Sequence, residues 1–382
     1  MSIKGFKNTN IYVEGKGIIK TSLLFDEKIR KISNDIESDG LLELDDKYIV
    51  VPGFIDEHIH GANKCDAMNG SIKELRSIAD KLVEEGTTSF NFTTMTMSKD
   101  KILKALEAIN TYLKDNSGNA KAIGIHLEGP FISKEYCGAQ DKENIVDSDV
   151  ELLKEFIKAS GNNITEITFR YNPNNKEFLK VLLENNIVPS IGHTDNTCAE
   201  TLEAIENGVK VSTHTFNGMR GIHHREIGTA GAILLSDKIN CELICDLHHV
   251  SADAIRLLFK NKGKDKIILI TDSIEAKYLC DGIYSLGGQK VIVKDGIAKL
   301  ESGVFAGSTL KLNVAVRNIK DTLNIPLTDA IDMASINPAK NLNVDDRIGS
   351  IKVGKDSDFV VIDKDVNVYK TFSKGKLVYS KE

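Results

Sequence analysis

The chain has 382 residues, of which 41% are hydrophobic and 27% charged, a balance typical of a soluble globular protein with a large core. Its formal net charge of −6 and its lack of a long basic run argue against nucleic acid or an anionic membrane as the main partner. The first residues lack the apolar core of a signal peptide, and no apolar run approaches the ~20 residues of a membrane span, so we expect a cytoplasmic protein. The six cysteines include no C-x-x-C pair, which predicts free thiols.

Short β-rich runs alternate with amphipathic helical stretches from residue 48 onward. The β-rich runs are eight in number and cover 48–60, 87–94, 120–130, 164–173, 187–194, 208–217, 241–250 and 266–273. The helical stretches between the earlier runs cover 72–86, 99–115, 150–160, 175–186 and 197–208. Eightfold alternation of strand and helix predicts an α/β fold, a TIM-type (β/α)8 barrel whose parallel strands are joined by crossover helices. A doubly wound open sheet is the structural alternative.

Both ends of the chain have a different pattern. Residues 3–47 and 348–380 contain short strands rich in Val, Ile and Tyr, separated by Gly-Lys and Asp turns. Neither end is long enough for a core of its own, so we expect them to pair as one small β-sandwich domain. The expected division is therefore 1–51 with 342–382 for the sandwich and 52–341 for the barrel. Within the barrel part, 283–301 is typical of a hairpin insertion, and 307–323 and 327–342 are typical of helices.

Polar residues that can bind metal gather where the predicted strands end. All nine histidines lie between His58 and His249, which indicates one site built by one domain. The strand ends carry His58 and His60, His126 and Glu128, His193, His214, and Asp272. Side chains two apart on a strand share a face, and catalytic groups of a barrel come from the carboxyl ends of several strands. We therefore expect these side chains to converge.

The converging residues have the composition of a catalytic metal site. Glu128, His193 and His214 supply one carboxylate and two imidazoles from three strands, the ligand set of a zinc or similar divalent site with an open position for water. Asp272 would lie beside that water and move its proton. His58 and His60 form an H-x-H pair that alone is a weak pattern and gains weight from the downstream residues.

Several segments together carry a family resemblance. They are PGFIDEHIHG (52–61), GIHLEGPFIS (124–133), GAQ (138–140), SIGHT (190–194), THTFNGM (213–219), HHREIG (223–228), CDLHHV (245–250), ITDS (270–273) and FAGST (305–309). With these motifs almost the whole chain resembles the amidohydrolase superfamily and, within it, the deacetylases that act on N-acetylglucosamine 6-phosphate. The resemblance implies a barrel with a small β-sandwich from both termini. It also implies metal-dependent hydrolysis of the acetamide to glucosamine 6-phosphate and acetate, in amino-sugar catabolism or cell-wall recycling.

The resemblance also implies roles for individual residues. Glu128, His193 and His214 match metal ligands, and Asp272 matches the general acid and base. Positions matching substrate contacts are Ala139, Gln140, Asn217, Gly218, Arg225, His249, Phe305, Ala306 and Gly307. Some relatives have histidine where Gln140 stands. Arg225 matches an arginine that binds phosphate in the neighbouring subunit's site, which implies a homodimer.

Several alternatives stay open at this point. The metal is expected to be zinc, with iron, manganese or cobalt as alternatives. Because the chain has His58 and His60, it could hold two metals per subunit rather than one. Strand four ends FRYNP without the lysine that usually bridges two metals in the superfamily, so Glu128 would have to bridge them. The sugar can be the gluco or the galacto epimer. A dihydroorotase-like or deaminase-like enzyme would leave Arg225 and the GAQ segment without a role, and a non-catalytic barrel would not need the metal ligands. No role is assigned to His223, His224 or His248, and His126 either supports Glu128 or is a hydrogen-bonded core residue.

Overall fold

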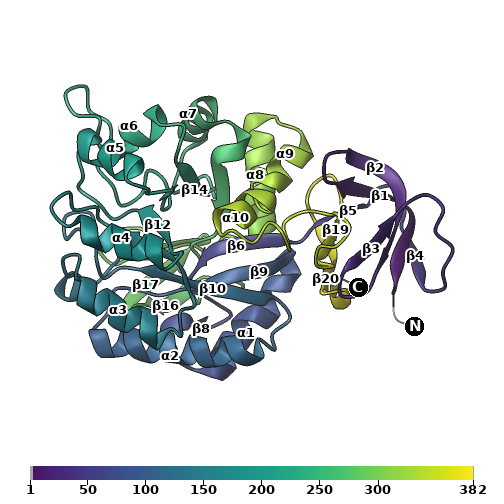
Figure 1. Cartoon of the computed structure of the whole chain (residues 1–382), viewed down its shortest axis with the longest axis horizontal. Helices are drawn as coiled ribbons and strands as arrows, with labels where there is room; N and C mark the ends of the chain where they lie inside the picture. Colours follow the sequence, from purple (N-terminus) through teal and green to yellow (C-terminus); the bar gives the residue numbers. More distant parts are fainter. Residues whose placement is uncertain (1–2, 382) are drawn as a thin grey trace.

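The structure, a computed structural model, describes residues 3–381, and most of them form a closed barrel of eight parallel strands surrounded by helices (Figure 1). The strands follow one another around the barrel in chain order as β6 (Phe54–Ile59), β9 (Thr87–Thr93), β10 (Lys121–Glu128), β11 (Ile164–Phe169), β12 (Val188–Ile191), β13 (Val211–Ser212), β14 (Asn240–Ile244) and β15 (Ile267–Ile270). Ser273, just after β15, forms a parallel bridge with Ile59 of β6 and closes the barrel. The predicted (β/α)8 class is confirmed, and the open-sheet alternative is wrong.

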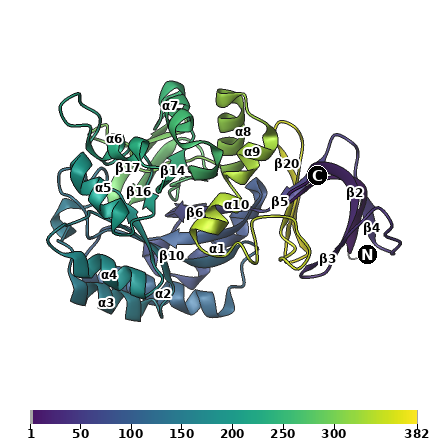
Figure 2. The same ribbon diagram turned by 45° about the horizontal axis from the view of Figure 1, so that its top comes forward.

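Helices cover the outside of the barrel, as both views show (Figures 1 and 2). They are α1 (Ile72–Leu82), α2 (Lys99–Asp115), α3 (Val150–Ala159), α4 (Lys176–Glu184), α5 (Cys198–Glu206), α6 (Gly228–Leu235), α7 (Ala252–Lys262) and α8 (Leu312–Leu323). Local caps fix where helices begin: Thr197 and Glu200 form a reciprocal capping box at α5. Among the residues that the structure describes, no helix is long and apolar enough to cross a membrane.

The barrel has an apolar outer layer and a polar interior. On β9, Phe92 points outward and packs against Tyr112 of α2 with ring centroids 5.5 Å apart. Because strand side chains alternate in direction, the neighbouring Asn91 points inward. Three buried acids, Glu57, Glu166 and Glu242, bring carboxylate oxygens within 4.8 Å of one another. The polar interior leads directly to the carboxyl ends of the strands.

Both ends of the chain meet in one sheet. Its strands are β1 (Gly5–Val13), β2 (Gly17–Phe25), β3 (Ile29–Ile32), β4 (Leu41–Glu43), β5 (Ile49–Pro52), β19 (Phe359–Ile362), β20 (Val368–Ser373) and β21 (Lys376–Ser380). Phe25 of β2 and Phe359 of β19 lie three strands apart in the sheet order, which is roughly 14 Å in a flat sheet. Their ring centroids are 5.0 Å apart, so the sheet folds over on itself as a sandwich around an aromatic core.

Three predicted segments differ in detail from the structure. Residues 283–301 form three antiparallel strands rather than a hairpin, because a second turn at Asp295 and Gly296 adds another strand; the three are β16 (Gly282–Leu286), β17 (Gln289–Lys294) and β18 (Ile297–Leu300). The single helix expected at 327–342 is two, α9 (Leu327–Asp332) and α10 (Ile336–Asn341), interrupted at Ser335. The run 48–60 divides at Gly53, where a Cβ atom would collide with Thr88, and β5 and β6 join different sheets.

Glu85 and Lys277 form an ion pair between completely buried side chains, with Oε1 and Nζ 2.7 Å apart; the second oxygen of Glu85 accepts from the hydroxyl of Tyr278 at 2.7 Å. Glu85→Leu leaves the Lys277 ammonium unpaired, so the free energy of unfolding should fall by about 3–5 kcal/mol in urea denaturation. The double variant Glu85→Leu/Lys277→Met should recover most of this loss. Equal losses in the single and double variants would contradict the ion-pair explanation.

Candidate metal and active site

Five of the predicted site residues converge at the carboxyl ends of the barrel strands. Glu128 lies at their centre: its Oε1 is 3.2 Å from His193 Nε2, 3.0 Å from His214 Nε2 and 3.6 Å from His58 Nε2. Its Oε2 is 3.3 Å from His60 Nε2. All of these side chains are buried. The structure therefore brings together side chains from four strands that the sequence separates by up to 156 positions, from His58 to His214.

The donors of His193 and His214 fit a divalent cation. Each Nδ1 faces a backbone carbonyl oxygen, Tyr136 O at 2.9 Å for His193 and Asn217 O at 3.1 Å for His214, so each Nδ1 must carry its hydrogen. The two Nε2 atoms then point at each other across 3.0 Å and at Glu128. Two neutral imidazoles in this arrangement present converging lone pairs beside a carboxylate. Ligand atoms around tetrahedral zinc at ~2.0–2.1 Å have a comparable spacing.

His58 and His60 provide a second group of donors against the same carboxylate. His58 Nδ1 lies 3.1 Å from Oε2 of Glu242, and its buried Nε2 has no hydrogen-bond partner among the described residues. His60 Nε2 lies 3.2 Å from Oδ1 of Asp272, which is also 3.5 Å from His58 Nε2. With Glu128, these two histidines form a second set that could hold a cation.

Electrostatics couple the carboxylates to the histidines. Burial acts to raise the pKa of Glu128, but the neighbouring His58, His193 and other imidazoles outweigh it and hold that pKa well below its usual range. Burial opposes charge on His60 as well, yet its hydrogen bonds to Asp272 and Glu128 raise its pKa to about 10. In the metal-free protein, protons on imidazoles therefore balance the buried carboxylates. Metal binding must displace such protons.

Three site residues have a backbone conformation that non-glycine residues rarely adopt. The φ angles of His193, His214 and Asp272 are 44°, 28° and 48°, in the left-handed region. Main-chain bonds hold Asp272 in place: its N–H donates to His58 O at 2.9 Å, and its carbonyl accepts from Ser308 N at 2.8 Å. Such strain persists where the surrounding structure enforces it and is common at functional sites. All three turn their side chains toward the cluster immediately after a strand.

A cavity of about 310 Å³ opens above the cluster. Its lining includes these predicted substrate contacts: Ala139, Gln140, Asn217, Gly218, His249, Phe305 and Gly307. Met95, Leu286 and Val304 also line it, and sequence reasoning did not single them out. A larger cavity of about 600 Å³ lies between the terminal sheet and the barrel, lined by residues such as Tyr12, Asp332 and Lys340. We place the site in the smaller cavity because it contains the convergent imidazoles and carboxylates.

Two of the predicted substrate contacts lie elsewhere. Arg225 lies on an exposed loop, where its Nη1 is 2.7 Å from His224 Nε2, and it does not line the cavity of its own chain. Ala306 is completely buried and does not line the cavity, unlike its neighbours Phe305 and Gly307. Gln140 lines the cavity, but its amide is already engaged: Nε2 donates to Glu128 at 2.7 Å, and Oε1 accepts from Thr96 N at 2.7 Å.

The remaining histidines have separate surroundings. His126 Nε2 lies 2.7 Å from the hydroxyl of Thr168, so His126 is a hydrogen-bonded interior residue rather than a partner of Glu128. His249 Nδ1 lies 2.6 Å from Asp246 Oδ2, and its ring packs against Phe305 at the cavity wall in a tilted arrangement, with ring centroids 4.5 Å apart. Glu242 is the contact residue that sequence reasoning missed. Its signal was an acidic residue inside the apolar run 241–250.

The fold and the cluster define a class of (β/α)8 barrels with a histidine–carboxylate centre at the carboxyl ends of the strands. A model of the amidohydrolase family matches residues 49–378. The N-acetylglucosamine-6-phosphate deacetylase of Bacillus subtilis is 40% identical over 339 residues, which cover 87% of this chain and 86% of the relative.

Solved structures agree with that match. The N-acetylglucosamine-6-phosphate deacetylase of Thermotoga maritima is 34% identical, with a TM-score of 0.89 over 99% of this chain and 100% of the other. A deacetylase variant from Mycobacterium smegmatis in complex with N-acetyl-D-glucosamine 6-phosphate is 25% identical, with a TM-score of 0.91 over 100% of both chains. The chain belongs to the amidohydrolase family, and the resemblance inferred from its motifs is confirmed.

Removal of divalent metal should destabilise the protein, because the cation balances Glu128 and occupies the converging imidazole lone pairs. Protein dialysed against a chelator should unfold at a lower temperature than protein with added zinc. The difference should grow with zinc concentration as ligand linkage requires. In His214→Ala the zinc-dependent rise should be much smaller. An identical unfolding temperature with and without zinc, together with no bound metal by elemental analysis, would exclude a metal centre here.

Proposed function

We propose that the chain hydrolyses the acetamide of N-acetylglucosamine 6-phosphate to glucosamine 6-phosphate and acetate. The observation that carries this proposal is the placement of Asp272 against the Glu128–histidine cluster in the wall of one cavity, with its Oδ1 3.2 Å from His60 Nε2. The named activities of the related deacetylases support the choice of substrate. We propose 52–341 as the catalytic domain, with 1–51 and 342–382 as the sandwich domain.

Glu128, His193 and His214 would hold the first divalent cation, and His58 and His60 with Glu128 would hold a second. Zinc suits the nitrogen-rich donor set, and iron, manganese and cobalt are alternatives that accept imidazole and carboxylate. When bound, the cation lowers the pKa of a coordinated water and polarises the acetamide carbonyl. Gln140 supports this centre by fixing Glu128, so we assign it a positioning role rather than a substrate contact.

Asp272 performs the proton transfers. Its carboxylate faces the cluster and the cavity, and His60 and His58 hold its pKa below the usual range against the effect of burial. It is therefore ionised and can accept the proton of the attacking water. It then delivers this proton to the amide nitrogen, because an amine leaves poorly unless it is protonated. The same carboxylate thus serves as base and then as acid.

The cavity wall would recognise the sugar phosphate. Asp246 holds His249 through a short contact to Nδ1, which directs the rest of the ring to the cavity beside Phe305. Ala139, Asn217 and Gly218 contribute small side chains and main-chain groups to the cavity lining from the loops that follow β10 and β13. Arg225 is exposed and does not line the cavity of its own chain, so we propose that it binds the phosphate in the neighbouring subunit of a homodimer. The free cysteines suit a cytoplasmic enzyme.

Acetate release from N-acetylglucosamine 6-phosphate tests the reaction directly, with N-acetylgalactosamine 6-phosphate assayed beside it. The metal-loaded protein should turn over the gluco compound. Asp272→Asn should lower kcat by at least about 10²-fold, since proton transfer contributes ~10²–10⁴-fold, while metal and substrate stay bound. Turnover of the galacto epimer alone would change the substrate. No acetate from either sugar by fully loaded protein would end the deacetylase proposal and favour cyclic amides.

Arg225→Ala should raise KM for the phosphorylated sugar by about 10- to 100-fold, because a charge-assisted contact to phosphate is worth ~1.5–3 kcal/mol. KM for unphosphorylated N-acetylglucosamine should change little. Mixing Arg225→Ala with Asp272→Asn chains tests the subunit arrangement. Hybrid dimers should recover part of the activity, since one of their sites has both Asp272 and the partner's arginine. Equal effects on both sugars, or no recovery on mixing, would contradict the proposed role.

A further inference from the structure

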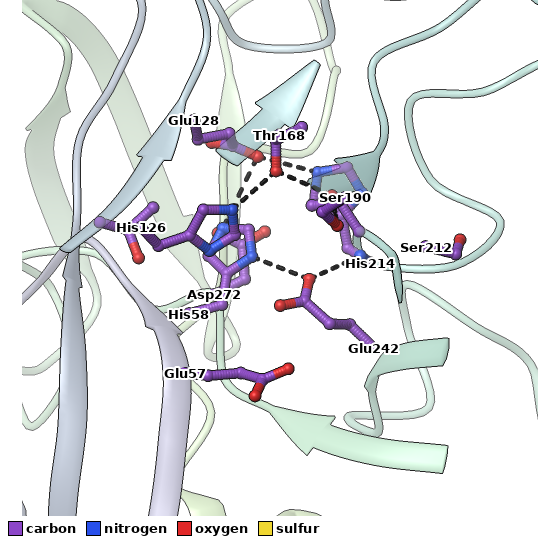
Figure 3. A network of polar contacts seen from close by, with 12 residues as sticks. Glu57, His58, His126, Glu128, Thr168, Ser190, Ser212, His214, Glu242 and Asp272 are labelled. Carbon is purple, nitrogen blue, oxygen red and sulfur yellow. Dashed lines mark hydrogen bonds and ion pairs between the residues drawn. The ribbon is translucent and has the colours of Figure 1, made fainter. Parts of the chain in front are cut away.

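We infer that Glu242 is the positioning residue that decides whether this site holds one cation or two. This inference rests on the metal assignment within the proposed function. Glu242 lies in β14, completely buried below the cluster, and is not in the cavity lining. It would act through His58 rather than on the substrate. Figure 3 shows its carboxylate between His58 and His214, with contacts to both.

One oxygen of Glu242 makes both contacts. Its Oε2 lies 3.1 Å from His58 Nδ1 and accepts from the backbone N–H of His214 at 3.0 Å. Because a backbone N–H can only donate, Oε2 accepts from His214. When this oxygen carries no hydrogen of its own, it also accepts from His58, and His58 Nδ1 then carries the hydrogen. This assignment leaves His58 Nε2 with a free lone pair, 3.6 Å from Glu128 and 3.5 Å from Asp272. That nitrogen has no other partner among the described residues.

The two cation positions differ in how their histidines are held. Backbone carbonyls of Tyr136 and Asn217 fix His193 and His214, and these main-chain acceptors do not depend on the side chains at positions 136 and 217. The corresponding acceptor for His58 is the side chain of Glu242. His60 receives no such support, since its buried Nδ1 has no partner among the described residues. The second position therefore relies on His58, and His58 relies on Glu242.

Loss of this acceptor affects the two positions unequally. Without Glu242 the imidazole of His58 is free to place its hydrogen on Nε2, where it blocks a cation, or to rotate in the polar interior. Loss of an outer carboxylate partner weakens metal binding by ~10–100-fold. The first position loses only the acceptor of the His214 backbone N–H, and it keeps Glu128 together with the main-chain acceptors of His193 Nδ1 and His214 Nδ1. Binding of the second cation thus depends on Glu242, and binding of the first does not.

The test is metal stoichiometry at fixed free zinc. Wild-type protein and three variants are equilibrated with buffered zinc, and metal per chain is measured by elemental analysis. We expect two zinc ions in wild type and close to two in Glu242→Gln, whose amide oxygen can accept the same two hydrogen bonds. Glu242→Leu should keep one and bind the second ~10–100-fold more weakly. Glu242→Ser, too short to reach His58, provides a second truncation if the leucine variant does not fold.

Glu166→Gln is the matched control, because Glu166 is an equally buried acid of the group formed with Glu57 and Glu242. It should keep two ions. Manganese-loaded samples add a spectroscopic readout: a spin-coupled pair in wild type and isolated ions in Glu242→Leu. Two tightly bound ions in Glu242→Leu, one ion in wild type, or equal loss in Glu166→Gln would overturn the inference. Acetate release by the wild-type protein is measured separately. If wild-type protein binds two zinc ions but releases no acetate, the deacetylase proposal fails while the positioning role of Glu242 still stands.

Discussion

The carboxylate of Glu128 is the interaction on which the rest of the site depends. It lies almost completely buried between four imidazoles, and an isolated charge in such a place is too costly to persist without partners. Either protons on the histidines or bound cations must balance it. The barrel makes the arrangement possible, because three parallel strands that are far apart in sequence deliver the pair His58 and His60, His193 and His214 to one rim. Each of these side chains lies at or just after the carboxyl end of its strand.

The positions around Glu128 are held with different firmness. Main-chain carbonyls orient His193 and His214, and main-chain bonds to His58 O and Ser308 N hold Asp272. The positive φ angles of these three residues turn the chain sharply after each strand and so direct the side chains toward the cluster. His58 instead depends on a side chain from another strand. The centre therefore combines one group of ligands that main-chain groups orient, His193 and His214, with a histidine, His58, whose orientation a single side-chain substitution can change.

The sequence predicted those features that depend on local periodicity and on position along a strand. Eight strands, their alternating helices and the polar strand ends follow from patterns within ten or fifteen residues, and the structure has them. Glu242 acts through a contact with a distant segment, 184 positions from its partner His58, and Gln140 reaches Glu128 through an irregular loop. Neither contact follows from the periodicity of a strand or a helix. The same limit explains why residues 283–301 were predicted to form a hairpin, whereas the turn at Asp295 and Gly296 adds a third strand.

The polar interior below the cluster explains why a barrel can hold so many acids. Burial, together with the charges of neighbouring carboxylates, raises the pKa of Glu57 and Glu166 well above the usual range, which favours the neutral acid form of both. Burial also raises the pKa of Glu242 to about 8, before any cation is present. Around the cluster, charge is thus favoured at the rim, where imidazoles and cations balance Glu128 and Asp272. A neutral interior beneath a charged rim lets the histidine donors respond to the cation rather than to competing charges below.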